Sequence, residues 1–361
     1  MKNEKIEVYG TFGPACKSQE ILEEMIQCGM TGMRLNLSHT TLEKSKEYLD
    51  NYKDAAQKYG VMPQILIDMQ GPELRIGEME EYALKVGDVV VFIDDAQRKT
   101  AGTERISCSS TEKDCVRILI PTEVVEALEV RMEVLLDDGK IKVLVEEAKE
   151  HFAIAKVMVG GGIKPHKSIK IVGENVTMPI LTEHDIENIR HAKEYGVTAL
   201  MQPFVFSGED LKKVRAILKA ENAEELQIFA KIENCIGVEN LDTIIPEADM
   251  IVIARGDLGN DMPLWQLPGI QKKIEDTCKK YMKPYMVVTQ MLASMEERPI
   301  PTRAEVSDIF HATFHGAKAV MVTGETAVGK YPGEVISYLA STAMEGAKYR
   351  KNIKNNVEFC K

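Results

Sequence analysis

The segments "LQIFAKIEN" (residues 226–234) and "ADMIVIARGDLG" (248–259) are two apolar strands, and both end in charged residues. Side chains alternate between the faces of a strand, so Lys231 and Glu233 share one face at the end of the first segment. An ion pair at a sheet edge would explain one such pair, because exposed pairs are common and weak. The other strands are needed to distinguish that reading from a functional site.

The same strand-then-helix alternation runs along most of the chain. It begins with "KIEVYGTFG" (5–13) as a strand and "SQEILEEMIQCGM" (18–30) as a helix, with Ser18 as the expected N-cap. Short units of this kind predict a parallel sheet. Eight strands, each followed by a helix, are expected if residues 77–166 form an insertion after the third strand.

The expected fold class is α/β, a (β/α)8 TIM barrel with an inserted, small β-barrel-like lid domain after strand 3. Residues 77–166 are rich in strand patterns, and "DDGK" (137–140) indicates a hairpin. Residues 1–76 and 167–345 together come close to the roughly 250 residues of such a barrel. A doubly wound open sheet is the alternative, which eight strands disfavour. Residues 346–361 are expected to form a short polar tail.

Composition excludes several classes of function. A net charge of −11 argues against nucleic acid as a main partner. No apolar run has the length of a membrane span, and the N-terminus has no signal-peptide pattern, so a cytoplasmic protein is expected. The seven cysteines lie far apart without a C-x-x-C, which argues against a zinc site and a disulfide framework. Any metal should therefore be a hard cation held by oxygen.

Polar residues follow the predicted strands at their carboxyl ends, where barrel enzymes have their active sites. They are Thr11; Arg34, Asn36, Ser38 and His39; Asp68, Glu73 and Arg75; Lys231 and Glu233; Arg255 and Asp257; Thr289 and Gln290; and Thr323 and Glu325. A purely structural role in the core would not explain this set, because buried charges must be paired or bind a metal.

The charges in this set suggest their ligands. Glu233 and Asp257, from neighbouring strands, suit Mg²⁺ bound through carboxylates and substrate oxygens. Arg34, Arg75 and Lys231 suit an anionic, phosphate-bearing substrate. The segment "RGDLG" predicts a turn into a short helix whose free N–H groups could hold a carboxylate.

Eight segments, in order, resemble the signature segments of the pyruvate kinase family: "TFGPAC", "GMRLNLSH", "DMQGPELR", "AKIEN", "ARGDLG", "TQMLASM", "PTRAEVSD" and "TGETAVGKYP". The resemblance covers residues 5–345, including the position of the β insertion. It implies phosphoryl transfer from phosphoenolpyruvate to ADP, giving pyruvate and ATP, with Mg²⁺ (or Mn²⁺) and K⁺ as cofactors. A non-catalytic paralogue that binds a phosphorylated acid, or a Mg²⁺-dependent decarboxylase, would use the same site.

The resemblance also implies residue roles. Lys231 would stabilise the transition state, and Arg34 would contact the transferring phosphate. Glu233 and Asp257 would hold Mg²⁺, while the backbone of Ala254, Arg255 and Gly256, with Thr289, would bind the substrate carboxylate. The ligands of K⁺ would be Asn36, Ser38, Asp68 and the carbonyl of Met69. The residues that would meet the nucleotide are Asn36, His39, Arg75 and Lys167.

The chain departs from the family pattern at several positions. Met69 and Gln70 stand where Thr-Lys is usual, and Pro203 and Phe206 replace a serine and an arginine. The chain also stops soon after the eighth helix, where the family continues with a further α/β domain. From this we expect a homodimer formed through the barrel.

Overall fold

The computed structural model describes residues 6–38, 40–71, 74–97, 115–137, 139–174, 176 and 179–358; for residues 354–358 only the backbone is described. The chain divides into two compact units. One comprises Met1–Gly71 and Ile180–Lys361, and the other comprises Pro72–Pro179. Each unit is described by itself.

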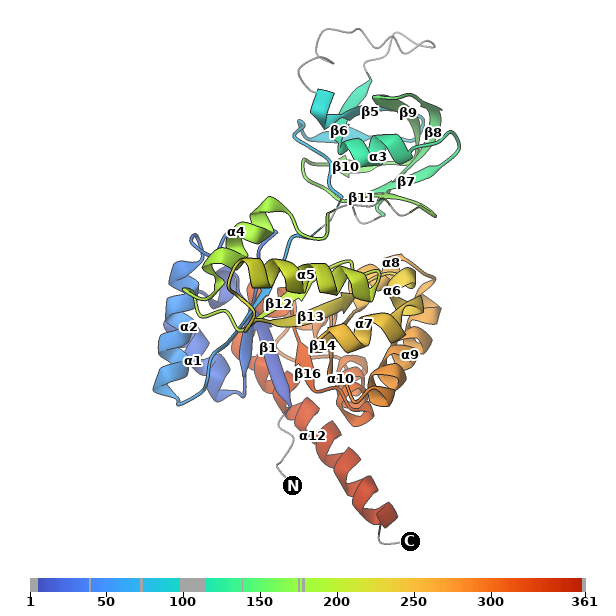
Figure 1. Ribbon diagram of the computed structural model, residues 1–361. Helices are drawn as coiled ribbons and strands as arrows, with labels where there is room; N and C mark the ends of the chain where they lie inside the picture. Colours follow the sequence, from blue (N-terminus) through green and yellow to red (C-terminus); the bar gives the residue numbers. More distant parts are fainter. Residues whose placement is uncertain are drawn as a thin grey trace. The chain divides into compact units, whose positions relative to one another are not determined.

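The first unit is a closed barrel of parallel strands surrounded by helices, as the strand-helix alternation predicted (Figure 1). The strand order around the barrel is β1-β16-β15-β14-β13-β12-β3-β2, so the doubly wound alternative is excluded. The strands are β1 (Glu7–Thr11), β2 (Gly32–Asn36), β3 (Gln64–Asp68), β12 (Ala199–Gln202), β13 (Gln227–Ile232), β14 (Met250–Ala254), β15 (Tyr285–Val288) and β16 (Ala319–Met321).

Helices connect successive strands, and shorter helical turns follow several strand ends. The longer helices are α1 (Gln19–Gln27), α2 (Lys46–Lys58), α4 (Glu183–Ala192), α5 (Gly208–Ala220), α7 (Leu241–Glu247), α9 (Leu267–Lys280), α10 (Arg303–His315) and α12 (Pro332–Glu358). The short ones are η1 (Pro14–Cys16), α6 (Cys235–Glu239), α8 (Arg255–Asn260), η3 (Leu264–Gln266), η4 (Ala293–Glu296) and α11 (Gly324–Ala327).

Two apolar layers hold the barrel together. Residues of one parity on the strands, among them Leu66, Met201, Phe229 and Met286, form a buried cluster inside the barrel. Residues of the other parity pack outward against the helices in a larger cluster. Each strand is therefore apolar on both faces, as expected of a parallel sheet covered by helices.

The second unit is an insertion between β3 and β12, as predicted. It contains a six-stranded sheet in the order β11-β7-β8-β9-β5-β6 and a two-stranded sheet of β10 and β4. Its elements are β4 (Tyr82–Leu84), β5 (Val89–Asp94), η2 (Asp95–Gln97), β6 (Val116–Ile120), α3 (Thr122–Ala127), β7 (Glu133–Leu136), β8 (Ile141–Ala148), β9 (Phe152–Val159), β10 (Gly161–Ile163) and β11 (Ile169–Ile171).

Two segments differ from the expected boundaries. The strand β11 belongs to the inserted sheet because it pairs with β7, and Arg75 pairs with Ser168 beside it, so the second unit extends beyond 77–166 at both ends. The helix α12 continues to Glu358, so it includes most of the predicted polar tail at residues 346–361. The sequence does not predict the pairing of β11 with β7, because a short apolar run does not show which distant strand it pairs with. It does not predict the end of α12 either, because a polar run does not show whether a helix continues through it.

The cysteines and the hydropathy of the helices bear on the expected absence of a disulfide framework and of a membrane span. Cys16, Cys28, Cys235 and Cys278 are free thiols. Cys115 is disulfide-bonded, which its spacing did not predict. In the described part of the chain, no helix combines the length and apolar character that a bilayer span requires.

Candidate active site

The inner face of the barrel changes from apolar to charged at the carboxyl ends of its strands. Phe229 lies in the inner cluster, and Lys231 follows two residues later on the same strand. Leu66 and Asp68 repeat this arrangement on β3. Because side chains alternate along a strand, the charged residues continue the inner column of the barrel.

Four of the predicted residues form one continuous chain of opposite charges. Arg34 donates to Asp68 Oδ2 through Nε at 2.8 Å and Nη2 at 2.6 Å. Lys231 Nζ lies 3.4 Å from Asp68 Oδ1 and 2.8 Å from Glu233 Oε1. The side chains of Lys231 and Glu233 are only 15% and 1% exposed, so this pair is not a surface ion pair.

Burial and mutual attraction set the charge states of this chain. Burial alone would lower the pKa of Lys231, but Asp68 and Glu233 outweigh it and raise that pKa, which keeps the ammonium charged. Burial also opposes ionisation of Asp68, yet Lys231 and Arg34 hold its pKa below the ordinary value. Glu233 behaves differently, because burial, reinforced by Asp257, raises its pKa from 4.5 to about 7.

The geometry of Glu233 suits a metal ligand. The backbone N–H of Phe204, a residue with φ of +50°, donates to Glu233 Oε2 at 2.9 Å. Glu233 Oε1 is buried, and Lys231 Nζ lies 2.8 Å from it. A buried carboxylate oxygen of this kind, next to a second carboxylate at Asp257, fits a hard divalent cation.

These two carboxylates would supply only part of a coordination shell. Within the described ranges, no group of three or more His, Cys, Asp or Glu side chains could hold a metal ion. Mg²⁺ commonly binds through one or two carboxylates and completes its octahedron with water and substrate oxygens. The donor set therefore fits Mg²⁺ or Mn²⁺ better than a metal that needs a full protein cage.

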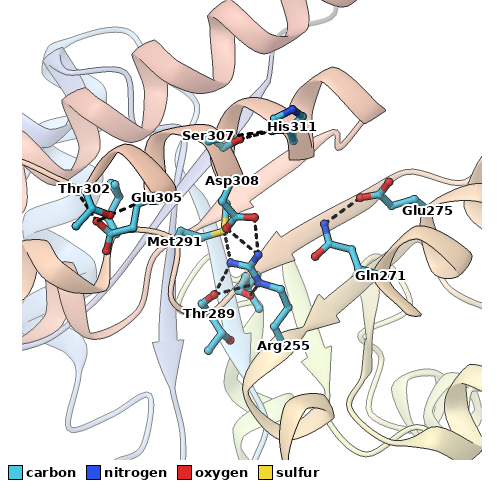
Figure 2. A network of polar contacts seen from close by, with 12 residues as sticks. Arg255, Gln271, Glu275, Thr289, Met291, Thr302, Glu305, Ser307, Asp308 and His311 are labelled. Carbon is cyan, nitrogen blue, oxygen red and sulfur yellow. Dashed lines mark hydrogen bonds and ion pairs between the residues drawn. The ribbon is translucent and has the colours of Figure 1, made fainter. Parts of the chain in front are cut away.

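The side chain of Arg255 lies in a separate network between β15 and α10 (Figure 2). Its Nη1 donates to both carboxylate oxygens of Asp308, at 2.9 and 2.7 Å, and Nη2 donates to the Thr289 carbonyl at 2.7 Å. Nε reaches the carbonyl of Val288, and Nη2 also contacts Met291 Sδ. The guanidinium is thus committed to holding the turn after β15.

That turn brings Thr289 to the start of α8. Thr289 and Gln290 have φ of +74° and +54°, which is a strained conformation for a β-branched residue such as threonine. A Cβ on Gly256 would lie 3.1 Å from the Thr289 methyl group. The predicted residues Ala254, Arg255 and Gly256 therefore form a backbone turn with the Thr289 side chain beside it.

The predicted residues after β2 and β3 are also described in part. Asn36 Oδ1 accepts the backbone N–H of Ser38 at 3.1 Å, which shapes the turn after β2. The backbone of that turn joins β3 through the Leu37 N–H and the Asp68 carbonyl, at 2.9 Å. The Met69 side chain is buried, so only its carbonyl could serve a cation.

Two predicted nucleotide residues belong to the second unit, and one lies outside the described residues. Arg75 Nη1 donates to the His166 carbonyl at 2.7 Å, and Lys167 Nζ lies 2.9 Å from Asp137 Oδ1. His39 is not among the described residues, so its prediction remains open.

Several residues that shape the site were not predicted as site residues. Phe204 supplies the N–H that anchors Glu233, and Asp308 anchors Arg255. Asp185 accepts the backbone N–H groups of Gln70 and Gly71. Only Asp185 had a local signal, because "TEHD" (182–185) has the spacing of a capping box.

The chain is similar to a known family over most of its length. The family described as "Pyruvate kinase, barrel domain" matches residues 3–336. The pyruvate kinases of Bacillus licheniformis and Thermococcus litoralis are 34% and 36% identical to the chain over 96% and 98% of its length. That of Chlamydia trachomatis serovar D is 35% identical over 94%.

The relatives differ in how much of their own length is matched. The chain spans 58% of the Bacillus licheniformis protein and 56% of the Geobacillus stearothermophilus protein, somewhat more than half of each. It spans 72% of the Thermococcus litoralis protein. The family match covers most of the barrel and the inserted sheets, and with it the charged residues at the strand ends. The chain belongs to the pyruvate kinase family.

Proposed function

We propose that this protein transfers a phosphoryl group from phosphoenolpyruvate to ADP. The bond between phosphorus and the enol oxygen breaks, a bond to a terminal oxygen of ADP forms, and the enolate takes up a proton to become pyruvate. The observation that carries the proposal is the buried chain from Arg34 through Asp68 and Lys231 to Glu233, in a member of this family.

Lys231 would stabilise the charge that develops during transfer. Its ammonium is held charged and fixed between Asp68 and Glu233, so no reorganisation is needed when the phosphoryl group moves. Phosphoryl transfer asks a protein mainly for positioning and electrostatic stabilisation. Arg34, fixed by Asp68, would add a second cation for the phosphate oxygens.

Glu233 and Asp257 would hold the divalent cation. When bound, that cation would neutralise charge on the phosphate and enolate oxygens. The Phe204 N–H fixes Glu233 Oε2, which leaves Oε1 for the metal. Metal binding would then require the ionised form of a carboxylate whose pKa is about 7.

The substrate carboxylate would bind at the turn between β14 and α8. The backbone N–H groups near Ala254, Arg255 and Gly256 begin a helix, and the Thr289 hydroxyl stands beside them. Gly256 leaves no room for a side chain without crowding the Thr289 methyl group at 3.1 Å. Asn36, His39, Arg75 and Lys167 are proposed to bind the nucleotide.

Potassium would bind near the ends of β2 and β3. Asn36, Ser38, Asp68 and the Met69 carbonyl are oxygen donors at adjacent strand ends, paired in register through Asn36 and Asp68. Oxygen ligands of this kind suit a hard cation.

Association through the barrel is a further part of the proposal. Leu264 and Trp265 in η3 are 69% and 83% exposed, which offers an apolar contact for a second copy of the chain. Light scattering should then give the mass of a dimer, and a monomer would contradict this part alone.

A coupled assay tests the activity directly. Pyruvate release from phosphoenolpyruvate should require ADP, Mg²⁺ and K⁺ together. Binding of phosphoenolpyruvate without turnover would favour a non-catalytic relative, and pyruvate formation from oxaloacetate without ADP would favour a decarboxylase.

A further inference from the structure

Asp185, at the start of α4, is a buried carboxylate with donors on two sides. Its Oδ2 accepts the Thr182 N–H at 2.9 Å and the Thr182 hydroxyl at 2.8 Å, which completes a capping box. The same oxygen accepts the Gly71 N–H at 2.9 Å, and Oδ1 accepts the Gln70 N–H at 2.8 Å. One carboxylate thus joins the helix cap to the loop after β3.

The bond from Gln70 fixes a particular peptide plane. The Gln70 N–H and the Met69 carbonyl belong to the same peptide unit, and in a trans peptide they point in opposite directions. All peptide bonds of the described chain are trans. Because Asp185 Oδ1 holds the N–H, the Met69 carbonyl must point away from α4.

We propose that Asp185 is a positioning residue for a monovalent cation, because it sets the direction of the Met69 carbonyl. A hydrogen bond from the N–H to an anion also polarises the peptide and makes its carbonyl oxygen more negative. This inference rests on the proposed function, in which Met69 is a ligand of K⁺. Asp185 itself does not touch the cation.

A second capping box in the same barrel shows what the cap alone requires. In α5, Asp210 Oδ2 accepts the N–H groups of Ser207 and Phe206 at 2.9 and 3.0 Å and lies 3.4 Å from the Ser207 hydroxyl. One oxygen is sufficient there. In Asp185 the second oxygen accepts the Gln70 N–H, which is no part of the cap, and the residue is fully buried, so its role extends beyond capping.

Other contacts of α4 and of the loop after β3 also hold the loops at these strand ends in place. His184 Nε2 lies 3.1 Å from the Leu37 carbonyl and 3.2 Å from that of Thr40, in the loop after β2. A Cβ on Gly71 would lie 2.3 Å from Pro203 Cγ, so the β3 loop packs on the segment that anchors Glu233 through Phe204. Helix α4 therefore positions the loops after both strands that carry the proposed K⁺ ligands.

Asp185→Asn tests the proposal, with Asp210→Asn as the matched control. The amide can keep its oxygen toward Thr182 and Gly71, but its NH₂ group then faces the Gln70 N–H, and two donors repel. We expect the half-saturating K⁺ concentration to rise about tenfold or more, since a hydrogen bond to a charged group is lost and a repulsive contact replaces it. The kcat at saturating K⁺ should change less than about threefold, and Asp210→Asn should leave the K⁺ curve unchanged.

A second measurement does not need turnover. Replacing tetramethylammonium chloride by KCl at equal ionic strength should raise the Tm of the wild type and of Asp210→Asn, and raise it less in Asp185→Asn. If Asp185→Asn does not fold, Asp185→Glu serves instead. Glutamate still suits a capping box, as Glu305 does in α10, but the longer side chain displaces the carboxylate from Gln70.

The outcomes separate this inference from the proposed function. A K⁺ response in activity and Tm that is unchanged in both Asp185 variants overturns the inference, whatever the activity is. In a second case, the wild type shows no turnover but still shows a K⁺-specific Tm shift that Asp185→Asn weakens. That result would support the inference and contradict the proposed function. Equal losses in Asp185→Asn and Asp210→Asn would show a role in capping only, which also overturns it.

Discussion

Two groups of cations and carboxylates lie at the carboxyl end of the barrel, and they are built differently. Arg255 pairs with Asp308 outside the ring of strands, and each Asp308 oxygen accepts a hydrogen bond from Nη1 (Figure 2). Lys231 lies inside the ring between Asp68 and Glu233, and its one ammonium is shared by Asp68 Oδ1, at 3.4 Å, and Glu233 Oε1, at 2.8 Å. One cation therefore faces one carboxylate in the outer group, whereas a single ammonium serves two carboxylates in the inner group.

This difference separates a structural pair from a site that can bind a cation. A buried charge costs folding free energy unless it is paired or binds a metal, and Asp257 adds a further carboxylate beside Glu233. The Arg255 group pairs one cation with one carboxylate and fixes a strained turn at Thr289. Substitutions in the inner group should therefore affect catalysis first, and those in the outer group should affect stability first.

Lys231→Met should give the largest effect. Removing a preorganised charge aimed at the transition state costs roughly 10²–10³-fold in kcat, and we expect about 10³-fold here because Lys231 is the central cation of the group. The circular dichroism spectrum should stay that of the wild type. Turnover within tenfold of the wild type would contradict the assignment of Lys231.

Glu233→Gln and Asp257→Asn should shift the requirement for metal. Each substitution keeps the size of the side chain and removes one negative charge from a site for a hard cation. We expect the half-saturating Mg²⁺ concentration to rise about tenfold or more in each variant. Titration of activity with Mg²⁺ measures this, with Glu209→Gln on the exposed face of α5 as the control. Superimposable titration curves would rule out the metal site.

Asp308→Ala should have its main effect on stability. It leaves the Arg255 guanidinium without its carboxylate, although the Val288 and Thr289 carbonyls remain, and the Asp308 side chain is 35% exposed. We expect a loss of about 1–3 kcal/mol in the free energy of unfolding, measured by urea denaturation. The Mg²⁺ titration should not move. A loss of activity without a loss of stability would break the contrast between the two groups.

The sequence predicted the barrel and the inner charges because both follow from short-range periodicity. The two-residue spacing that placed Lys231 and Glu233 on one face also placed Phe229 in the inner cluster beneath them. Eight strand-helix units then favoured a closed ring over an open sheet, and the structure has the closed ring. These inferences needed only the alternation of side chains along a strand and the usual size of a barrel.

The residues that orient the site could not be predicted in the same way. Phe204 contributes only a backbone N–H, which carries no side-chain signal. Asp308 lies 53 positions from Arg255 in the sequence, and Asp185 lies 115 positions from Gln70. Contacts over such separations depend on the closed ring, and the capping-box pattern of Asp185 explains only one of its two oxygens.

The smallest predicted effect concerns pH and the inner group without a metal. Glu233 has a pKa of about 7 in the folded protein, against an ordinary value of 4.5. Between these values the folded state keeps a proton that the unfolded state has released, so the free energy of unfolding should fall as the pH rises through this window.

Glu233→Gln isolates that contribution, because it removes the titrating group and keeps its size. In the presence of EDTA, the free energy of unfolding of the wild type, measured relative to that of this variant, should fall by about 1 kcal/mol between pH 5 and 7. A single uncoupled group changes this free energy by at most about 1.4 kcal/mol per pH unit. Coupling to Lys231 spreads the titration and makes the slope smaller. Added Mg²⁺ should restore the wild type at pH 7, because it binds the ionised carboxylate. Asp308→Ala keeps Glu233 and its neighbours, so its stability should fall over the same pH window as that of the wild type. If wild type and Glu233→Gln instead run parallel from pH 5 to 7, Glu233 is ionised throughout, and Lys231 neutralises it fully without help from a metal.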